Sequence, residues 1–233
     1  GVFPIDNVTF DWLEARALTV EKRGLSGVES DADARDGDSP RMNYGRISKL
    51  KQTAPYADPD AFYAKELVLD LATVEPNVSG PDNVKTMTTA KTMEKQGLKI
   101  HKAYLVSCVN SRVEDLAEAA KTIKGKKVAD HVEFYIAAAS SEVQAESESR
   151  GDWQTLVDAG ARPLPPGCGP CIGLGVGLLD ENEVGISATN RNFKGRMGAK
   201  SAKAYLASPA VVAASAVAGQ VVSPYAYDDA KPV

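Results

Sequence analysis

The chain has 233 residues, of which 43% are hydrophobic and 25% are charged, and these values are typical of globular proteins with one or two cores. Its 31 acidic and 27 basic side chains give a formal charge of -4, so no overall positive field favours nucleic acid or an anionic membrane as a partner. No stretch approaches the roughly 20 apolar residues that a membrane-spanning helix needs. We therefore expect a soluble chain that folds at least in part.

The first residues and the cysteines indicate the cellular context of the chain. The start, residues 1–4, lacks Met and lacks the basic and apolar regions of a signal peptide, so we expect that a longer protein precedes it. Three cysteines are too few and too unevenly spaced for the disulfide framework of a secreted domain. This pattern indicates a reducing compartment and cysteines retained for their chemistry.

Residues 1–60 are polar and interrupted, and they are interpreted as the end of a preceding domain and a linker. Their most loop-like stretch is 29–40. Its acidic spacing invites comparison with a calcium loop, but that motif needs an oxygen ligand at its fifth position and Gly at its sixth, where this stretch has Arg35 and Asp36. A solvated loop is the better interpretation.

From residue 61 the pattern predicts an α/β domain, residues 61–222, with a largely parallel sheet in a three-layer α/β/α arrangement, followed by the start of an interdomain linker at 223–233. Gly160 and Gly219 suit the left-handed caps that end helices, and Ser208 suits a helix N-cap. The last helix is apolar on nearly every side and must be buried. The predicted strands are 66–71, 102–106, 132–138 and 184–188, and the predicted helices are 113–123, one within 141–150, 153–159 and one from 209 to about 218.

The most unusual segment is 165–177, in which five glycines and three prolines surround Cys168 and Cys171. This composition predicts no regular element, because glycine permits unusual dihedral angles and proline removes backbone donors. Glycine would let both thiolates turn toward one point. A lone C-x-x-C pair leaves three interpretations open: a glycine-rich turn with incidental thiols, a redox pair, or half of a zinc site.

The third cysteine favours a shared metal site. Cys108 comes directly after a predicted strand and before a predicted helix, and ligands bind at the carboxyl ends of parallel strands. The partial positive charge at the helix N-terminus favours the thiolate. Three cysteines can hold three corners of a 4Fe-4S cluster, and the chain has no fourth cysteine for the last iron. Its two histidines, His101 and His131, do not fit the spacing of a zinc motif.

Two arginines follow the predicted strand at 184–188. Arg191 and Arg196 carry planar guanidinium groups that match carboxylates with two hydrogen bonds each, as a substrate with several carboxylates would need. The competing interpretation is a basic surface turn. We expect both arginines to lie near the cysteines.

Three segments together resemble the cluster and substrate motifs of the aconitase superfamily: 107–112, 167–171 and 190–196. The order and approximate separation of the motifs agree with that family, and the resemblance covers residues 61–222 in detail, with 2–6 similar to the segment that leads into this domain. Within the superfamily, segments 106–112, 134–142 and 205–216 look most like the fungal homoaconitases, which are mitochondrial enzymes of lysine biosynthesis through α-aminoadipate.

The resemblance implies roles for six residues. Cys108, Cys168 and Cys171 would bind a 4Fe-4S cluster, Asn190 would contact the cluster region, and Arg191 and Arg196 would bind substrate carboxylates. The implied activity is that of a hydro-lyase that dehydrates homocitrate and hydrates homoaconitate to homoisocitrate. The family's serine base lies on a domain that this chain does not match, so we expect a fragment that needs the remaining domains of the same enzyme.

Three alternatives stay open. Within the family, the chain could belong to an isopropylmalate isomerase or an aconitase. A non-catalytic metal-binding or RNA-binding module is a second possibility, although the charge and the lack of a basic, aromatic face disfavour RNA. A dithiol redox protein using Cys168 and Cys171 would leave Cys108 and the arginines unexplained.

Overall fold

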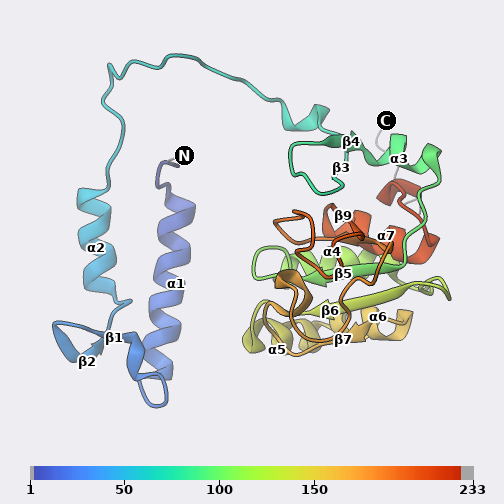
Figure 1. Ribbon diagram of the computed structural model, residues 1–233. Coiled ribbons are helices and arrows are strands. Elements are labelled where there is room, and N and C mark those ends of the chain that lie inside the picture. Colours follow the sequence, from blue (N-terminus) through green and yellow to red (C-terminus); the bar gives the residue numbers. More distant parts are fainter. Residues whose placement is uncertain (1–2, 227–233) are drawn as a thin grey trace. The chain divides into compact units, whose positions relative to one another are not determined.

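The computed structural model describes residues 3–226 (Figure 1). Its internal contacts divide the chain into two compact units between Leu69 and Asp70, which is later than the predicted boundary at residue 60. The two units are described separately.

The amino-terminal unit consists of two helices and a small hairpin. The helices enclose a core of Phe10, Ala17 and Ile47. The two strands of the hairpin pair antiparallel, with Asp33 opposite Asp36. The elements are α1 (Asn7–Arg23), the 3₁₀ helix η1 (Glu29–Asp31), β1 (Ala32–Asp33), β2 (Asp36–Pro40) and α2 (Tyr44–Thr53).

Residues 1–60 were interpreted as the end of a preceding domain and a linker, and the expected irregularity was wrong, because α1, the hairpin and α2 form within them. Each helix has a side-chain cap at its start: the Asp6 carboxylate accepts from the Thr9 amide at 2.8 Å, and the Asn43 side chain accepts from the Arg46 amide at 3.0 Å. Such caps satisfy amides that would otherwise lack a partner in the first turn. In α1, Phe10 and Ala17 are buried whereas Val8, Trp12 and Leu18 are exposed, so its apolar residues do not share one face. With Ile47 of α2, the two buried residues form the small core between the helices.

The acidic stretch 29–40, which was interpreted as a solvated loop, contains regular structure. It holds η1 and both hairpin strands. Its carboxylates form ion pairs with arginines, Asp31 with Arg23 at 2.5 Å and Asp33 with Arg46 at 3.3 Å. These ion pairs connect η1 to α1 and the hairpin to α2.

The predicted strand at 66–71 does not form. Residues 61–70 have no regular structure, and the 3₁₀ helix η2 (Leu71–Thr73) follows them. Leu67, Val68 and Leu69 are 82%, 88% and 69% exposed. The apolar alternation is that of a strand, but among residues 3–226 this segment pairs with no neighbouring strand, and a single strand has no partners for its backbone groups.

The carboxy-terminal unit is built on a seven-stranded sheet with the order β4-β3-β9-β8-β5-β6-β7. Strands β9, β8, β5, β6 and β7 are parallel, and β3 pairs antiparallel with both β4 and β9. The bounds are β3 (Asn77–Ser79), β4 (Met87–Thr89), α3 (Ala90–Gln96), β5 (Lys102–Val106), α4 (Val113–Ile123), β6 (Glu133–Ala137), α5 (Ser141–Arg150), α6 (Asp152–Ala159), β7 (Arg162–Pro163), η3 (Gly169–Ile172), β8 (Val184–Ser187), β9 (Lys203–Leu206), α7 (Pro209–Ala218) and η4 (Pro224–Ala226).

Helices α4, α5, α6 and α7 pack against one another and cover one face of this sheet (Figure 1). The predicted helix 113–123 is confirmed, and so are the left-handed caps at Gly160 and Gly219 and the side-chain cap at Ser208. Helix α7 is buried along most of its length, as its uniformly apolar sequence predicted. The α/β class with a largely parallel sheet is confirmed.

The opposite face of the sheet is covered by long loops and the one-turn helix η3, which form the third layer. Residues on β5 and β6 alternate between the two faces, as the pleat of a strand requires. Ala103 and Leu105 face the helices, whereas Tyr104 and Val106 belong to a second core with Cys171, Leu179 and Met197. This second core lies under the loops that carry the cysteine and arginine motifs.

The strand order also defines where the connections reverse direction. From β5 the chain proceeds to β6 and β7 on one side, then crosses to β8 and β9 on the other side of β5. In open parallel sheets, ligands bind at the carboxyl ends of the strands at such a switch point. The predicted linker at 223–233 contains η4, and its residues 227–233 lie outside the described part of the chain.

Candidate metal centre

All three sequence motifs lie in loops that follow the carboxyl ends of parallel strands. Cys108 follows β5, the segment with Cys168 and Cys171 follows β7, and Asn190 follows β8. Strands β5 and β8 are neighbours at the switch point of the sheet. The fold thus directs segments as far apart in sequence as Cys108 and Asn190 toward one edge of the sheet.

The loop that carries Cys108 is held by its own serines. The Ser107 hydroxyl accepts from the amides of Val109 and Asn110 at 2.9 and 3.2 Å, and the Ser111 hydroxyl accepts from the Ser107 amide at 2.9 Å. Cys108 itself is exposed. Helix α4 begins five residues after it, at Val113, so the thiol stands on the N-terminal side of that helix.

Asn110 connects the loops that follow the two central strands. Its side-chain amide donates to the Ala188 carbonyl at 2.8 Å, across the switch point from β5 to β8. The Ser187 and Thr189 hydroxyls, both buried, are 2.9 Å apart on the β8 side. These contacts fix the position of the Cys108 loop relative to the segment that carries the arginines.

The cysteine segment is more regular than its composition predicted, because η3 (Gly169–Ile172) forms within it. The Cys171 amide donates to the Cys168 carbonyl at 2.9 Å, which closes one tight turn between the two cysteines. Cys168 is exposed, whereas Cys171 is only 6% exposed and belongs to the second core. The turn therefore leaves one thiol at the surface and buries the other.

Arg196 lies directly beside the buried thiol. Its Nη2 atom donates to the Cys171 Sγ atom at 3.8 Å, and its guanidinium stands 5.3 Å from the centre of the Phe193 ring. The Arg196 Nε atom is buried and has no hydrogen-bond partner within residues 3–226. A buried guanidinium donor without a partner is costly, so this position favours an additional acceptor.

Burial, a guanidinium group and the two other thiols all affect the pKa of Cys171. Burial raises the pKa of the Cys171 thiol, the nearby Arg196 guanidinium lowers it, and negative charge on Cys168 and on Cys108 raises it. The pKa of Cys171 is raised overall. The donor set fits an iron-sulfur cluster in its chemistry, because it consists of three thiols, two on one turn and one on a separate loop, with an arginine beside one of them.

Asn190 and Arg191 differ from Arg196 in their surroundings. Both are exposed, and the Arg191 Nη1 atom donates to the Asn190 carbonyl at 3.2 Å. In the part of the chain that the structure describes, no hydrogen bond joins either side chain to a cysteine. Their assignment as cluster and substrate contacts stays a prediction.

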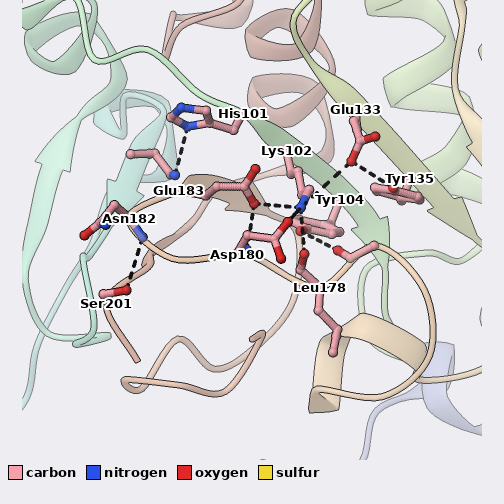
Figure 2. A network of polar contacts seen from close by, with 12 residues as sticks. His101, Lys102, Tyr104, Glu133, Tyr135, Leu178, Asp180, Asn182, Glu183 and Ser201 are labelled. Carbon is pink, nitrogen blue, oxygen red and sulfur yellow. Dashed lines mark hydrogen bonds and ion pairs between the residues drawn. The ribbon is translucent and has the colours of Figure 1, made fainter. Parts of the chain in front are cut away.

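A network of polar side chains beneath the loops was not predicted from the sequence (Figure 2). The Lys102 ammonium, at the start of β5, contacts Asp180 and Glu183, and the Tyr104 hydroxyl donates to the backbone of the same loop. Desolvation lowers the pKa of Lys102, but the two carboxylates more than compensate and the pKa is raised overall. Burial raises the pKa of Tyr104 far above its usual value, so its hydroxyl stays protonated.

The side-chain geometry of the described residues differs from that of a site for a single metal ion. Within residues 3–226, no three His, Cys, Asp or Glu side chains are close enough together to hold one ion. In a cluster each thiolate binds a different iron. The cysteine sulfur atoms around a cluster therefore stand further apart than the ligand atoms around one ion. Two surface pockets lie in the amino-terminal unit, lined by residues such as Leu13 and Ile47 or Ala17 and Tyr44, and neither is lined by a cysteine.

Comparison with known families shows to which family the chain belongs. The family model described as the aconitase family (aconitate hydratase) matches residues 1–219. The chain belongs to the aconitase family. The match extends over the cysteine and arginine motifs and also over the amino-terminal helical unit, of which the sequence alone had indicated only residues 2–6.

Several curated aconitase-family relatives are more than half identical to this chain. The homoaconitase of Mycosarcoma maydis is 55% identical over 224 residues, which cover 96% of this chain and 30% of the relative. Those of Cryptococcus neoformans and Candida parapsilosis are 53% and 52% identical, over 98% and 100% of this chain. All three are named mitochondrial homoaconitases. The chain spans about 30% of the length of the relatives it matches.

No helix in residues 3–226 is both long and apolar enough to cross a membrane.

Proposed function

We propose that this chain is the cluster-binding part of a mitochondrial homoaconitase, a hydro-lyase of lysine biosynthesis. The homoaconitase would dehydrate homocitrate and hydrate homoaconitate to homoisocitrate. The observation that carries the proposal is the contact between Arg196 and Cys171, since it puts a carboxylate-binding side chain beside a thiol of the cysteine motif. Membership of the aconitase family and the identity with the fungal homoaconitases support the same conclusion.

Cys108, Cys168 and Cys171 would hold a 4Fe-4S cluster, with one iron left free of protein ligands. Such a cluster supplies Lewis acidity that weakens the C–O bond of a bound hydroxy acid. The chain's own contribution is to arrange the ligands. Tight turns present Cys108 and Cys168 at the surface, and burial keeps Cys171 in a fixed position beneath them.

Arg196 would bind a carboxylate of the substrate. A tricarboxylic acid loses hydration when it approaches the cluster, and a guanidinium group compensates this cost through charge-assisted hydrogen bonds. The Nε atom of Arg196 is an available donor for this purpose, because it is buried without a partner in the described residues. Arg191 and Asn190, both exposed, would complete the binding of the substrate's other polar groups.

Proton abstraction needs a positioned base, and no residue of this chain matches the family's serine base. The rest of the enzyme would supply this base. We therefore expect the isolated chain to lack hydratase activity even when its cluster is assembled. Isopropylmalate isomerase and aconitase remain the alternatives within the family, and the substrate that the full enzyme accepts decides between them.

The first experiment is anaerobic reconstitution of the chain with iron and sulfide, followed by absorbance and electron paramagnetic resonance. We expect cluster spectra from the unaltered chain and their loss in Cys108→Ser, Cys168→Ser and Cys171→Ser variants. A full set of cluster signals in the Cys108→Ser variant would contradict the three-cysteine assignment.

The second experiment concerns Arg196 in the full-length enzyme. Arg196→Lys keeps the charge but loses the two-bond geometry, so we expect kcat/KM for homoaconitate to fall about 100-fold while the cluster absorbance is retained. Lys194→Gln, which removes an exposed cation from the same segment, is the matched control and should change kcat/KM less than about three-fold. If Arg196→Lys changed kcat/KM no more than about three-fold, as the control does, the charge at Arg196 would suffice and the two-bond geometry would be refuted.

A further inference from the structure

Lys102 is a buried lysine whose three closest partners all lie in one loop. Its side chain is 6% exposed. The ammonium donates to the Leu178 carbonyl at 2.7 Å, to Asp180 at 2.9 Å and to Glu183 at 2.6 Å (Figure 2). An ammonium group is expensive to remove from water, so it stays buried only where several acceptors compensate. Lys102 therefore holds the segment 178–183 firmly against β5.

Tyr104, two residues further along the same face of β5, binds the residue before that segment. Its hydroxyl donates to the Gly177 carbonyl at 2.7 Å. The Tyr104 ring stacks on the Tyr135 ring with 5.8 Å between their centres. A Cβ atom at Gly177 would lie 2.7 Å from the Tyr135 ring, so the backbone of Gly177 rests directly on these aromatic side chains. One strand thus binds two consecutive carbonyl groups, those of Gly177 and Leu178.

The cysteine segment is attached at its other end as well. The Gly167 amide donates to the Ala138 carbonyl at 3.3 Å, and the Leu164 amide donates to the Ile136 carbonyl at 2.8 Å. Between Gly167 and Gly177 lie both Cys168 and Cys171. A glycine-rich loop has many accessible conformations, and fixing both of its ends removes most of them. The arrangement of the two thiols thus depends on attachments outside the C-x-x-C sequence.

We infer that Lys102 and Tyr104 are positioning residues for the cysteine segment: by binding the carbonyl groups of Leu178 and Gly177 they hold Cys168 and Cys171 in the arrangement that retains the cluster. This inference rests on the proposed function, because it assumes that these thiols bind a cluster. Within residues 3–226, neither side chain forms a hydrogen bond with a thiol; their hydrogen bonds go to Gly177, Leu178, Asp180 and Glu183. Their effect is to reduce the conformational freedom that ligand binding would otherwise have to remove.

The test uses two tyrosine variants that each lose a single hydroxyl group. Tyr104→Phe removes the hydrogen bond to Gly177 and keeps the ring, whereas Tyr135→Phe removes a hydroxyl that donates to Glu133 and not to the loop. In the full-length, reconstituted enzyme, the decay of cluster absorbance is followed after addition of an iron chelator. We expect about five-fold faster loss for Tyr104→Phe, as one hydrogen bond predicts, and less than two-fold for Tyr135→Phe. Lys102→Met should accelerate the loss by about ten-fold or more.

A second measurement needs no cluster. In the cluster-free enzyme, the alkylation rates of individual cysteines by iodoacetamide are measured by mass spectrometry. We expect faster alkylation of Cys171 in Tyr104→Phe, with the rate at Cys108 unchanged, because Cys108 lies on a separate loop held by its own serines. Equal acceleration at both cysteines would indicate general destabilisation and would overturn the inference.

The two measurements separate the inference from the proposed function. If the unaltered enzyme forms no cluster, the proposed function fails, and the alkylation rates still decide whether Tyr104 positions Cys171. If the enzyme forms a cluster and loses it at the same rate in Tyr104→Phe and Tyr135→Phe, the positioning role is refuted. Should Lys102→Met fail to fold, the tyrosine pair decides alone.

Discussion

Replacing Gly177 by alanine tests how tightly the cysteine segment rests on the sheet. A Cβ atom at this position would meet three atoms of the Tyr135 ring at 2.7–2.9 Å. Gly177 has a φ of +81°, and Gly175 in the same loop has a φ of +78° with nothing within 4 Å of its Cβ position. Gly175→Ala is therefore a matched control, since it carries the same backbone strain without the collision.

The expected magnitudes follow from these contacts. The left-handed backbone costs an alanine about 1 kcal/mol at either position. At Gly177 the collision adds about 1–2 kcal/mol, and a weakened Tyr104 hydrogen bond adds about 1 kcal/mol. We expect a decrease in the free energy of unfolding of about 1 kcal/mol for Gly175→Ala and about 3 kcal/mol for Gly177→Ala.

Urea unfolding measures this difference. Trp153 is buried in α6 of the carboxy-terminal unit, so its fluorescence reports that unit once Trp12 of the amino-terminal unit is replaced by Phe. With a denaturant slope of about 2 kcal/mol per M, the two alanine variants should differ by about 1 M in their urea midpoints. If their midpoints agree within about 0.2 M, the loop is not packed on Tyr135 as described.

Three further predictions concern the carboxy-terminal unit. Leu116→Ala, at a fully buried position of α4, should lower the free energy of unfolding by about 3 kcal/mol in the same urea assay. Ser140→Ala removes the side-chain cap of α5 and should cost about 1 kcal/mol, and an unchanged urea midpoint would contradict the capping role. Burial opposes ionisation of Glu133, but hydrogen bonds from Tyr135 and Arg162 lower its pKa overall. The charged form therefore stabilises the fold. The advantage of the wild type over Glu133→Gln should be full at neutral pH and should be lost as the pH falls below the ordinary pKa of a glutamate and through the lowered pKa of Glu133, in urea titrations at a series of pH values.

Local patterns predicted the helices and central strands of the carboxy-terminal unit because their signals are strong and short in range. Apolar residues at helical spacing gave α4 with its correct bounds, and the apolar run at 102–106 gave β5. Helix α1 was missed because its apolar residues are spread around the helix: Phe10 and Ala17 are buried, whereas Val8, Trp12 and Leu18 are exposed. Strands β3, β4 and β9 are each three or four residues long, and their order depends on partners that are distant in the sequence.

The candidate site shows the same difference between short-range patterns, which the sequence reveals, and long-range contacts, which it does not. The cysteine and arginine motifs are visible in the sequence because their residue types are chemically specific. Lys102 gave no signal, because a lysine at the start of a strand is ordinarily solvated, and its partners in the loop are 76 to 81 residues away. The contact of Arg196 with Cys171 spans 25 residues and depends on how the loops fold over the sheet. Residue types thus indicated the chemistry of the site. Only the tertiary structure indicated which residues hold the cysteine and arginine motifs in place.

The extended segment before η2 has a practical consequence for handling the isolated chain. Leu67, Val68 and Leu69 are exposed side by side in a stretch whose alternation suits a β-strand, with acidic Glu66 and Asp70 on either side. Exposed apolar strands without partners readily join those of other molecules and seed aggregates. Light scattering of the isolated chain should therefore rise with concentration, and Val68→Lys should suppress the rise by adding a charge that repels a second strand. Preparations for spectroscopy are best kept dilute or made with this substitution.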